Sequence, residues 1–264
     1  MRGRFLLLGT GSSTGTPLIG CHCPVCLSTA AFNKRLRPSA LIEVAEKKFV
    51  IDVGPDFREQ ALKYGIDHLD GILITHSHYD HIAGIDELRA LSFRDNKKIP
   101  CLLSEETFEE IKIRYHYMMQ PMKDEREVVC SQLKFHLLRK TRGDVHFEGL
   151  PVGFFSYAQV GMKVTGYRFG NLAYVPDIHD YEETIFEAMA GVEILILDAL
   201  KEDLSIAHFS LDEAMGFAKK TGVKQVIFTH IAHEMEHDRI NQKLPSNMRL
   251  GYDGQEIFFE IPGP

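Results

Sequence analysis

Three histidines and an aspartate lie within six positions directly after an apolar segment. The sequence THSHYDH begins at Thr75 and follows the run Ile-Leu-Ile. In an extended chain, residues i and i+2 point to the same side, so His76 and His78 can bind one cation. The chain then turns, and the adjacent pair Asp80 and His81 can face a second cation. Because imidazole and carboxylate groups suit Zn²⁺, Mn²⁺ or Fe²⁺, the sequence predicts a metal centre.

The charge balance excludes two broad classes of partner. The 264 residues include 30 Lys and Arg against 37 Asp and Glu, a net charge of -7. A protein that wraps DNA or lies on a membrane surface needs a basic face. No apolar run approaches the roughly 20 residues that cross a bilayer. We therefore expect a cytoplasmic protein with no membrane partner, whose bound cations allow it to attract a small anion.

The cysteines point to a second metal site. Cys21, Cys23 and Cys26 lie within six positions and make up three of the five cysteines in the chain. Five cysteines are too few for a disulfide scaffold. Their clustering instead predicts metal binding in a reducing compartment.

Short apolar runs alternate with helical segments along the whole chain, and two or three β-hairpins interrupt them. Two packed sheets covered by helices fit this mixture better than one doubly wound sheet. We expect one domain over residues 1–264, with a helix at 181–190 that starts at Asp180. A capping box at Ser210 and Glu213 predicts another helix that ends at Gly222.

The pattern His-x-His-x-Asp-His after a strand resembles the signature of the metallo-β-lactamase superfamily. Phe49–Asp52 with Gly54 resembles the early strand whose Asp supports the metal loop from behind. Tyr174–Asp177 resembles the element that supplies the bridging carboxylate, and Phe228–His230 resembles the one that supplies the last His. The resemblance extends over most of the chain. It implies an α/β (α+β) fold, a four-layer αββα sandwich of two mixed sheets flanked by helices.

Two N-terminal motifs indicate which subgroup of the superfamily the chain resembles. Gly9-Thr10-Gly11 with Cys21–Cys26 is similar to PhnP-type cyclic phosphodiesterases and ribonuclease Z-related proteins. In that group three cysteines and a His, placed three positions after the last catalytic His, hold a structural zinc. Here that His is His233, and the zinc loop is expected at residues 20–27. Three thiolates and one imidazole make a closed tetrahedral site.

One position departs from the family pattern. The family has a third His for the first metal, and alignment on the strand at 166–169 places Gln159 there. An amide oxygen is a weaker zinc ligand than imidazole. A register slip of one residue stays open, as does replacement by His146 or His179.

The resemblance implies two catalytic cations held by a shared set of side chains. The expected ligands are His76, His78, Asp80, His81, Asp177, His230 and, more weakly, Gln159. Two cations about 3.5–4 Å apart share a water and lower its pKa toward about 7. The resulting metal-bound hydroxide attacks phosphorus, and His208 matches a family His that lies by the phosphate as a general acid. Asp80 and His208 are expected to be required for catalysis, and Asp52 to orient the ligands.

We therefore expect a metal-dependent phosphodiesterase that acts on a small, linear or cyclic, phosphate ester. One structural Zn²⁺ and one or two catalytic ions, Zn²⁺, Mn²⁺ or Fe²⁺, are the expected cofactors. A ribonuclease Z-like nuclease is an alternative, but no basic, Gly/Pro-rich insertion for gripping RNA is present, so nucleic acids beyond a short oligonucleotide or nucleotide are not expected. Three other functions stay open: thioester or lactam hydrolysis, a redox or persulfide function, and a non-catalytic binding protein whose metal site is impaired by Gln159. The protein could also form a homodimer.

Two further motifs have simpler interpretations. Residues 233–237 match HExxH, the zinc-binding helix of metalloproteases. His233 is better explained by the cysteine loop, and no third ligand follows on a suitable helix. The basic residues Lys34, Arg35 and Arg37 are expected on the solvated surface, with an anionic ligand as the alternative. The glycine turn at residues 9–11 is expected to pass close to the active site.

Overall fold

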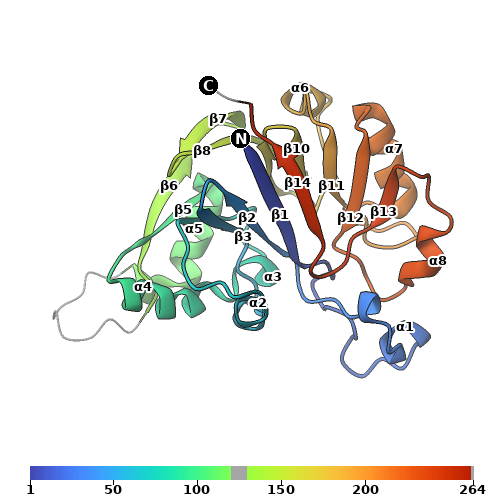
Figure 1. Ribbon diagram of the computed structural model, residues 1–264, viewed down its shortest axis with the longest axis horizontal. Helices are drawn as coiled ribbons and strands as arrows, with labels where there is room; N and C mark the ends of the chain where they lie inside the picture. The colour runs from blue at the N-terminus through green and yellow to red at the C-terminus, as the bar shows by residue number, and fades with distance from the viewer. Residues whose placement is uncertain (120–129, 263–264) are drawn as a thin grey trace.

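Two seven-stranded sheets pack face to face in the computed structural model, which describes residues 1–119 and 130–262 (Figure 1). The first sheet has the strand order β14-β1-β2-β3-β4-β5-β6. Its strands are β1 (Arg2–Gly9), β2 (Ser39–Val44), β3 (Lys47–Ile51), β4 (Gly71–Leu73), β5 (Ile99–Ser104), β6 (Leu133–Leu138) and β14 (Glu256–Glu260). Strands β3 to β6 run parallel, whereas β14, β1, β2 and β3 pair antiparallel.

The second sheet has the order β13-β12-β11-β10-β9-β8-β7. Its strands are β7 (Arg142–Phe147), β8 (Leu150–Gln159), β9 (Met162–Phe169), β10 (Leu172–Val175), β11 (Ile194–Asp198), β12 (Gln225–Thr229) and β13 (Met248–Leu250). Strands β10 to β13 are parallel, and β7 to β10 form antiparallel pairs. Both sheets are therefore mixed.

Helices α2 to α8 lie outside the two sheets, and α1 belongs to the cysteine-rich loop. The helices are α1 (Pro24–Leu27), α2 (Phe57–Tyr64), α3 (Tyr79–Ile82), α4 (Arg89–Asp95), α5 (Glu105–Arg114), α6 (Ile185–Ala188), α7 (Leu211–Thr221) and α8 (His237–Asn241). Figure 1 shows α2 to α5 on the side of the first sheet and α6 to α8 on the side of the second. Within the described residues no helix is long and apolar enough to cross a membrane.

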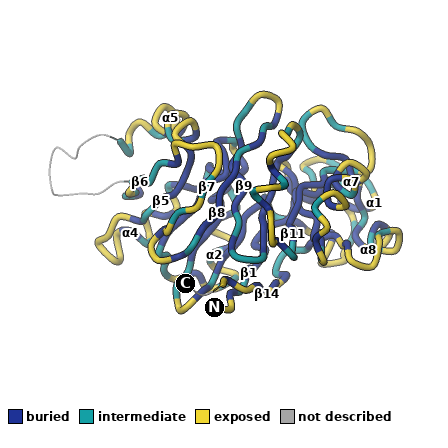
Figure 2. The backbone as a smooth tube through the Cα atoms, turned by 90° about the horizontal axis from the view of Figure 1, so that it is seen from above, coloured by how far each residue is buried: buried dark blue, intermediate teal, exposed yellow. Residues whose placement is uncertain are grey.

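Three apolar clusters correspond to the three interfaces between these four layers. One cluster lies between the sheets, with Phe5 and Tyr174 in ring contact at its centre. A second joins the first sheet to helices such as α2 and α5, and a third joins the second sheet to α6, α7 and α8. In Figure 2 most residues of central strands such as β11 are buried, whereas the edge strand β7 and the outer helices carry exposed residues. The predicted αββα sandwich is confirmed.

Parallel pairing brings together the carboxyl ends of the strands that the predicted metal ligands follow. Strand β3 runs parallel to β4, with Ile51 opposite Leu73. In the second sheet β10, β11 and β12 run parallel, and Leu197 lies between Val175 and Phe228. In parallel sheets, ligands bind outside the carboxyl ends of the strands. Each predicted catalytic metal ligand except Gln159 follows the end of one of these strands.

Two sequence-based expectations are wrong. The helix expected at 181–190 covers only Ile185–Ala188, because the backbone of His179 and Asp180 pairs with Ala158 on the edge of β8. Arg35 is 3% exposed rather than solvated. Its guanidinium donates to Thr10 Oγ1 and to the Gly251 carbonyl, so it joins the N-terminal and C-terminal loops.

A tyrosine connects the two sheets directly before the histidine loop. The buried hydroxyl of Tyr167 on β9 donates to the carbonyl of Ile74 at 2.7 Å. The backbone N–H of Thr165 donates to the carbonyl of Thr75 at 2.9 Å. These bonds fix the chain one and two residues before His76.

We predict that Tyr167→Phe lowers the free energy of unfolding by about 1–3 kcal/mol, because it leaves the buried Ile74 carbonyl without a partner. Urea denaturation followed by circular dichroism measures the change. Tyr64→Phe is the matched control, since the Tyr64 hydroxyl has no hydrogen-bond partner among the described residues. Equal stability losses in the two variants would contradict the role given to Tyr167.

Candidate active site

The histidine loop forms the first half of the site. His78 is the residue that precedes helix α3, so the chain changes from extended to helical at Tyr79 as the spacing predicts. His76 Nε2 lies 3.0 Å from His78 Nδ1 and 3.5 Å from Asp177 Oδ2. Ligand atoms of His76, His78 and Asp177 lie within 4.8 Å of one another.

A second cluster shares one carboxylate with the first. Ligand atoms of Asp80, His81, Asp177 and His230 also lie within 4.8 Å of one another. Asp177 Oδ1 is 3.3 Å from His81 Nε2, and Asp177 Oδ2 is 3.5 Å from His230 Nε2. The structure therefore brings together the predicted ligands of both cations, with Asp177 between the two groups. That metal ions bind there stays a prediction.

Asp52 supports the histidine loop from behind, as expected. Its carboxylate lies 2.7 Å from His81 Nδ1 and accepts hydrogen bonds from the Thr75 N–H and hydroxyl, each at 2.8 Å. The contact to Nδ1 leaves Nε2 of His81 facing the cluster. Gly54 is required nearby, because a Cβ there would lie 2.0 Å from the Asp80 carbonyl oxygen.

Three site residues have a left-handed backbone. Asp52, Asp177 and His230 have φ angles of 60°, 51° and 59°. Each follows the end of a strand, and positive φ is uncommon outside glycine. The chain thus turns sharply at the strand end, where Asp177 and His230 meet residues of the other sheet and Asp52 meets Thr75 and His81 after the neighbouring strand β4. Such strained positions are concentrated at functional sites.

The electrostatic field in the cluster favours positive charge. Burial opposes protonation of His81, but Asp177, Asp80 and Asp52 outweigh it and raise its pKa well above the ordinary value. Burial likewise opposes ionisation of Asp177, yet His230, His81 and His76 hold its pKa well below the usual range. The carboxylate is thus in the ionised form that a cation requires.

The donor atoms fit divalent cations. His81 Nε2 and Asp177 Oδ1 are buried and make no hydrogen bond with described residues. Buried polar atoms without partners are costly in proteins unless an ion or water satisfies them. Imidazole nitrogens and carboxylate oxygens in clusters of three and four are the ligands of Zn²⁺ and related ions.

Gln159 lies at the edge of the cluster, beside Asp177 and His208. It ends β8, is 3% exposed, and places Nε2 3.4 Å from Asp177 Oδ2 and 2.7 Å from His208 Nε2. Neither suggested substitute belongs to a ligand cluster: His146 is exposed on β7, and the His179 ring pairs with Asp180. The cluster around His76 thus has an amide at its edge instead of a third imidazole.

Sequence reasoning missed Asp198, the last residue of β11. Its Oδ2 lies 2.9 Å from His208 Nδ1, and its Oδ1 lies 3.7 Å from His230 Nδ1. Burial would lower the pKa of His208, but the charge of Asp198 and this hydrogen bond raise it to about 9. An acidic residue directly after the apolar run Ile194–Leu197 was the available signal, since Asp52 follows its own strand in the same way.

A pocket of about 550 Å³ opens onto these residues. Asp80, Asp177, His208 and His230 are part of its wall, and Ser13 adds a group from the N-terminal loop. The glycine turn before Ser13 passes the site as expected, because Gly11 pairs with Ile231 next to His230.

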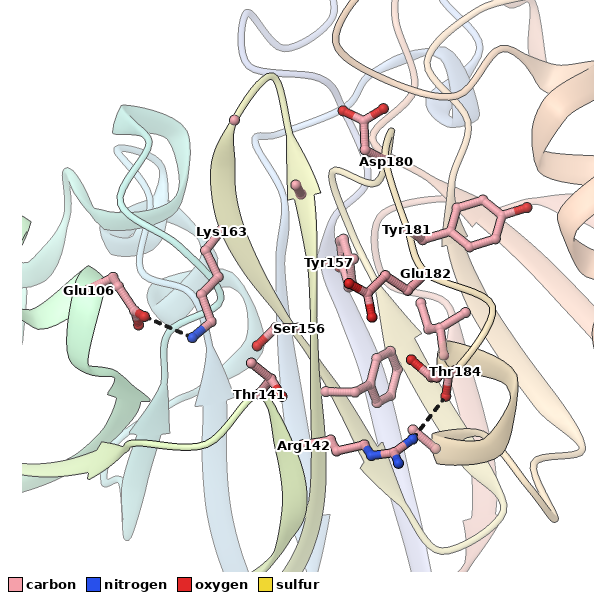
Figure 3. Close-up of a pocket in the computed structure, with 15 residues that line it drawn as sticks. Glu106, Thr141, Arg142, Ser156, Tyr157, Lys163, Asp180, Tyr181, Glu182 and Thr184 are labelled. Atoms are coloured by element: carbon pink, nitrogen blue, oxygen red, sulfur yellow. Dashed lines mark hydrogen bonds and ion pairs between the residues drawn. The ribbon is translucent and has the colours of Figure 1, made fainter.

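A larger cavity of about 700 Å³ is lined by residues of β8 together with Lys163 and the segment that leads into α6 (Figure 3). Ala158 lines this cavity, whereas the next residue, Gln159, lines the site. Lys163 pairs with Glu106 there. The larger cavity contains none of the clustered ligands and is not the candidate site.

The cysteine loop gathers as predicted. Ligand atoms of Cys21, Cys23, Cys26 and His233 lie within 4.8 Å of one another. The His233 ring, with Nδ1 3.4 Å from the Cys23 sulfur, lowers the pKa of that thiol to about 6. Burial raises the pKa of Cys26 to about 11, so metal binding there must release a proton. His233 precedes α8, in which His237 is the first residue, so the HExxH match does not form one helix.

The clustered imidazole and carboxylate groups have the donor set of a metal site. Comparison with known proteins identifies the family: the sequence model described as "Beta-lactamase superfamily domain" matches residues 47–231. A crystal structure described as a new diphosphatase from the PhnP family is 34% identical, has a TM-score of 0.91, and covers 99% of this chain and 98% of that one. The chain therefore belongs to the metallo-β-lactamase superfamily, and the expected resemblance to PhnP-type proteins is confirmed.

Two other relatives are informative. The octanoyltransferase of Porphyromonas gingivalis (strain ATCC BAA-308 / W83) is 32% identical over 267 residues, which cover 98% of this chain. They cover 52% of that protein, so this chain spans about half the length of the curated relative. Zn²⁺-bound PqqB from Methylobacterium extorquens is 16% identical, has a TM-score of 0.74, and covers 96% of this chain and 99% of that one. At this identity PqqB shows the fold alone.

We predict that Cys23→Ser removes one zinc per chain and lowers Tm, since a hydroxyl replaces a thiolate ligand. Elemental analysis by mass spectrometry and a thermal melt measure the two effects. Cys130→Ser is the matched control, because Cys130 lies outside every ligand cluster found in the described residues. An unchanged zinc content in Cys23→Ser would exclude the structural site.

We also predict that Gln159→His tightens binding of one catalytic ion, because an imidazole replaces an amide beside Asp177. Titration of the metal-free protein with Zn²⁺ in a calorimeter resolves the affinity of each ion. Gln159→Leu serves as the control, since it removes the amide without adding a ligand. Equal affinities in Gln159→His and the parent protein would contradict the position assigned to this residue.

Proposed function

We propose that this protein is a metal-dependent phosphodiesterase that acts on a small, linear or cyclic, phosphate ester. The observation that carries the proposal is the pair of ligand clusters that share Asp177 beside the pocket. The similarity to a protein described as a PhnP-family diphosphatase, at 34% identity over nearly the whole chain, supports phosphorus rather than carbon as the reacting centre.

Asp177 would be shared by two cations, with His76 and His78 on one side and Asp80, His81 and His230 on the other. When bound, such cations act as Lewis acids and lower the pKa of water. Zinc is the proposed metal, because imidazole nitrogens and carboxylate oxygens are among its usual ligands. A further zinc is proposed for the cysteine loop. Mn²⁺ and Fe²⁺ are alternatives for the catalytic cluster.

His208 is the proposed proton donor to the leaving group. Its Nδ1 is held by Asp198, so a proton given to a substrate would come from Nε2, where the substrate would replace the contact with Gln159. Asp198 also keeps the ring charged, which suits an acid that must give up a proton. His208 lies in the pocket wall, with its ring stacked on that of His230, so it can reach a leaving oxygen in the pocket. Asp52 fixes the orientation of the His81 ring through its contact with Nδ1.

Two other substrates are favoured by specific observations. A phosphoanhydride substrate is favoured by the similarity to the protein described as a PhnP-family diphosphatase. An acyl thioester is favoured by the similarity to an octanoyltransferase, of which this chain covers about half. A ribonuclease Z-like activity has less support, because none of the described residues that line the pocket is Lys or Arg.

We predict that His78→Ala and Asp80→Ala abolish hydrolysis of bis(p-nitrophenyl) phosphate by the zinc-loaded protein while the fold is kept. Each substitution removes a ligand from one of the two clusters. Release of p-nitrophenol measures activity, and circular dichroism measures the fold. His146→Ala, on the exposed face of β7, is the control and keeps full activity.

A substrate panel identifies the type of bond that the protein cleaves. It contains a nucleoside 2′,3′-cyclic phosphate, ADP and an octanoyl thioester. Cleavage of the diester and the cyclic phosphate supports the proposal. Cleavage of the thioester alone, or no turnover of any compound with saturating Zn²⁺ or Mn²⁺, would overturn it.

A further inference from the structure

The wall of the pocket is apolar on the side that faces solvent. Tyr79, Val160, Met162 and Ala207 line it there, and we call these four residues the apolar rim. The side chains of Tyr79 and Val160 are 68% and 64% exposed. Ile206, which precedes Ala207, is 88% exposed. The apolar rim is therefore accessible surface, not hydrophobic core.

The polar part of the pocket is confined to the metal cluster and its neighbours. Among the described lining residues, Ser13 and the Tyr79 hydroxyl are the polar side-chain groups that do not belong to the ligand clusters or to Gln159 and His208. None of these lining residues is Lys or Arg. A nucleoside needs several placed hydrogen-bond partners, and a second phosphate needs cationic ones. The outer pocket offers neither, so its composition favours an uncharged, apolar group.

The backbone at Val160 adds an independent observation. Val160 and Gly161 form a two-residue hairpin turn, because Gln159 pairs with Met162. Both have positive φ, 46° and 79°, a geometry for which Asn-Gly is the preferred sequence. A β-branched residue at positive φ is a genuine outlier. Since Val160 is exposed, packing in the core does not account for a valine at this position.

The same turn geometry occurs at the other end of β8 without an apolar residue. Glu148 and Gly149 join Phe147 to Leu150 and have φ angles of 49° and 87°. Glu148 lies at the far end of the strand from Gln159 and outside the site pocket. The two turns therefore form a matched pair, of which one borders the pocket and carries valine.

We propose that the substrate carries an alkyl chain that lies on the apolar rim while its phosphoryl group is held at the metal cluster. The placement of the phosphoryl group rests on the proposed function. The rim itself selects the other half of the substrate, an aliphatic chain, in preference to a nucleoside or a second phosphate. Val160 contributes apolar contact at the mouth of the pocket, a binding role that accounts for a valine in an unfavourable backbone conformation.

Binding of methyl-, butyl- and octylphosphonate to the zinc-loaded protein tests this proposal without any turnover. Isothermal titration calorimetry measures each Kd, below the concentration at which octylphosphonate forms micelles. A buried methylene contributes ~0.8 kcal/mol, so Kd is expected to fall by up to about four-fold for each methylene that the rim covers. Phenylphosphonate is included to detect an aromatic preference.

Val160→Asn is the decisive variant, because Asn tolerates positive φ and the fold is expected to keep or gain stability. The ratio of the methyl to the octyl Kd is expected to fall at least three-fold in this variant. Glu148→Asn, in the matched turn, is expected to leave the ratio unchanged.

Three results would overturn the proposal: a Kd that does not depend on chain length, an equal change of the ratio in both variants, or tight binding of phenylphosphonate with weak binding of the alkyl series. Failure of the proposed function is seen separately, as absence of turnover of bis(p-nitrophenyl) phosphate. Chain-length-dependent binding in a protein without that turnover would support the apolar rim and contradict only the phosphodiesterase.

Discussion

A single buried carboxylate determines how the site is organised. Asp177 is 1% exposed and lies within 3.5 Å of imidazole nitrogens from His76, His81 and His230. A buried charge is stable only when opposite charges or hydrogen bonds compensate it. Asp177 comes from the second sheet, whereas His76 and His81 come from the first. The contact between the two sheets is therefore what assembles the site.

The hydrogen bonds of Asp52 and Tyr167 hold the histidine loop in place behind the predicted ligands. Asp52 is fully buried and is satisfied by His81 and by two groups of Thr75. Tyr167 reaches across from the second sheet to the residue before Thr75. The histidine loop is thus held on its first residues by the opposite sheet and on its last residue by a carboxylate. Such support fixes ring orientation, and with it the nitrogen that faces the cluster.

The pocket combines this charged cluster with an apolar mouth. The two parts have different origins, since the cluster follows the ends of parallel strands and the apolar rim includes the tip of the β8–β9 hairpin. Surface hairpins vary more readily than strand ends buried between sheets. A fold of this kind can therefore keep one cleavage chemistry and change the group that it recognises.

The sequence by itself determined the fold class and showed which segments are rich in potential metal ligands, because hydrophobic periodicity and residue spacing are local properties of the chain. Alignment with the family pattern predicted Gln159 as a weak ligand, and the structure places its side chain beside Asp177. The sequence did not identify Asp198, the burial of Arg35 or the apolar rim, and it extended α6 too far. Each of these depends on contacts between residues distant in the chain: Asp198 meets His208 and His230, and Arg35 meets Gly251. Only the packing of the two sheets decides which side chains contact one another. A local sequence pattern specifies the face of a strand to which a side chain points, but not the residue from a distant segment that it meets there.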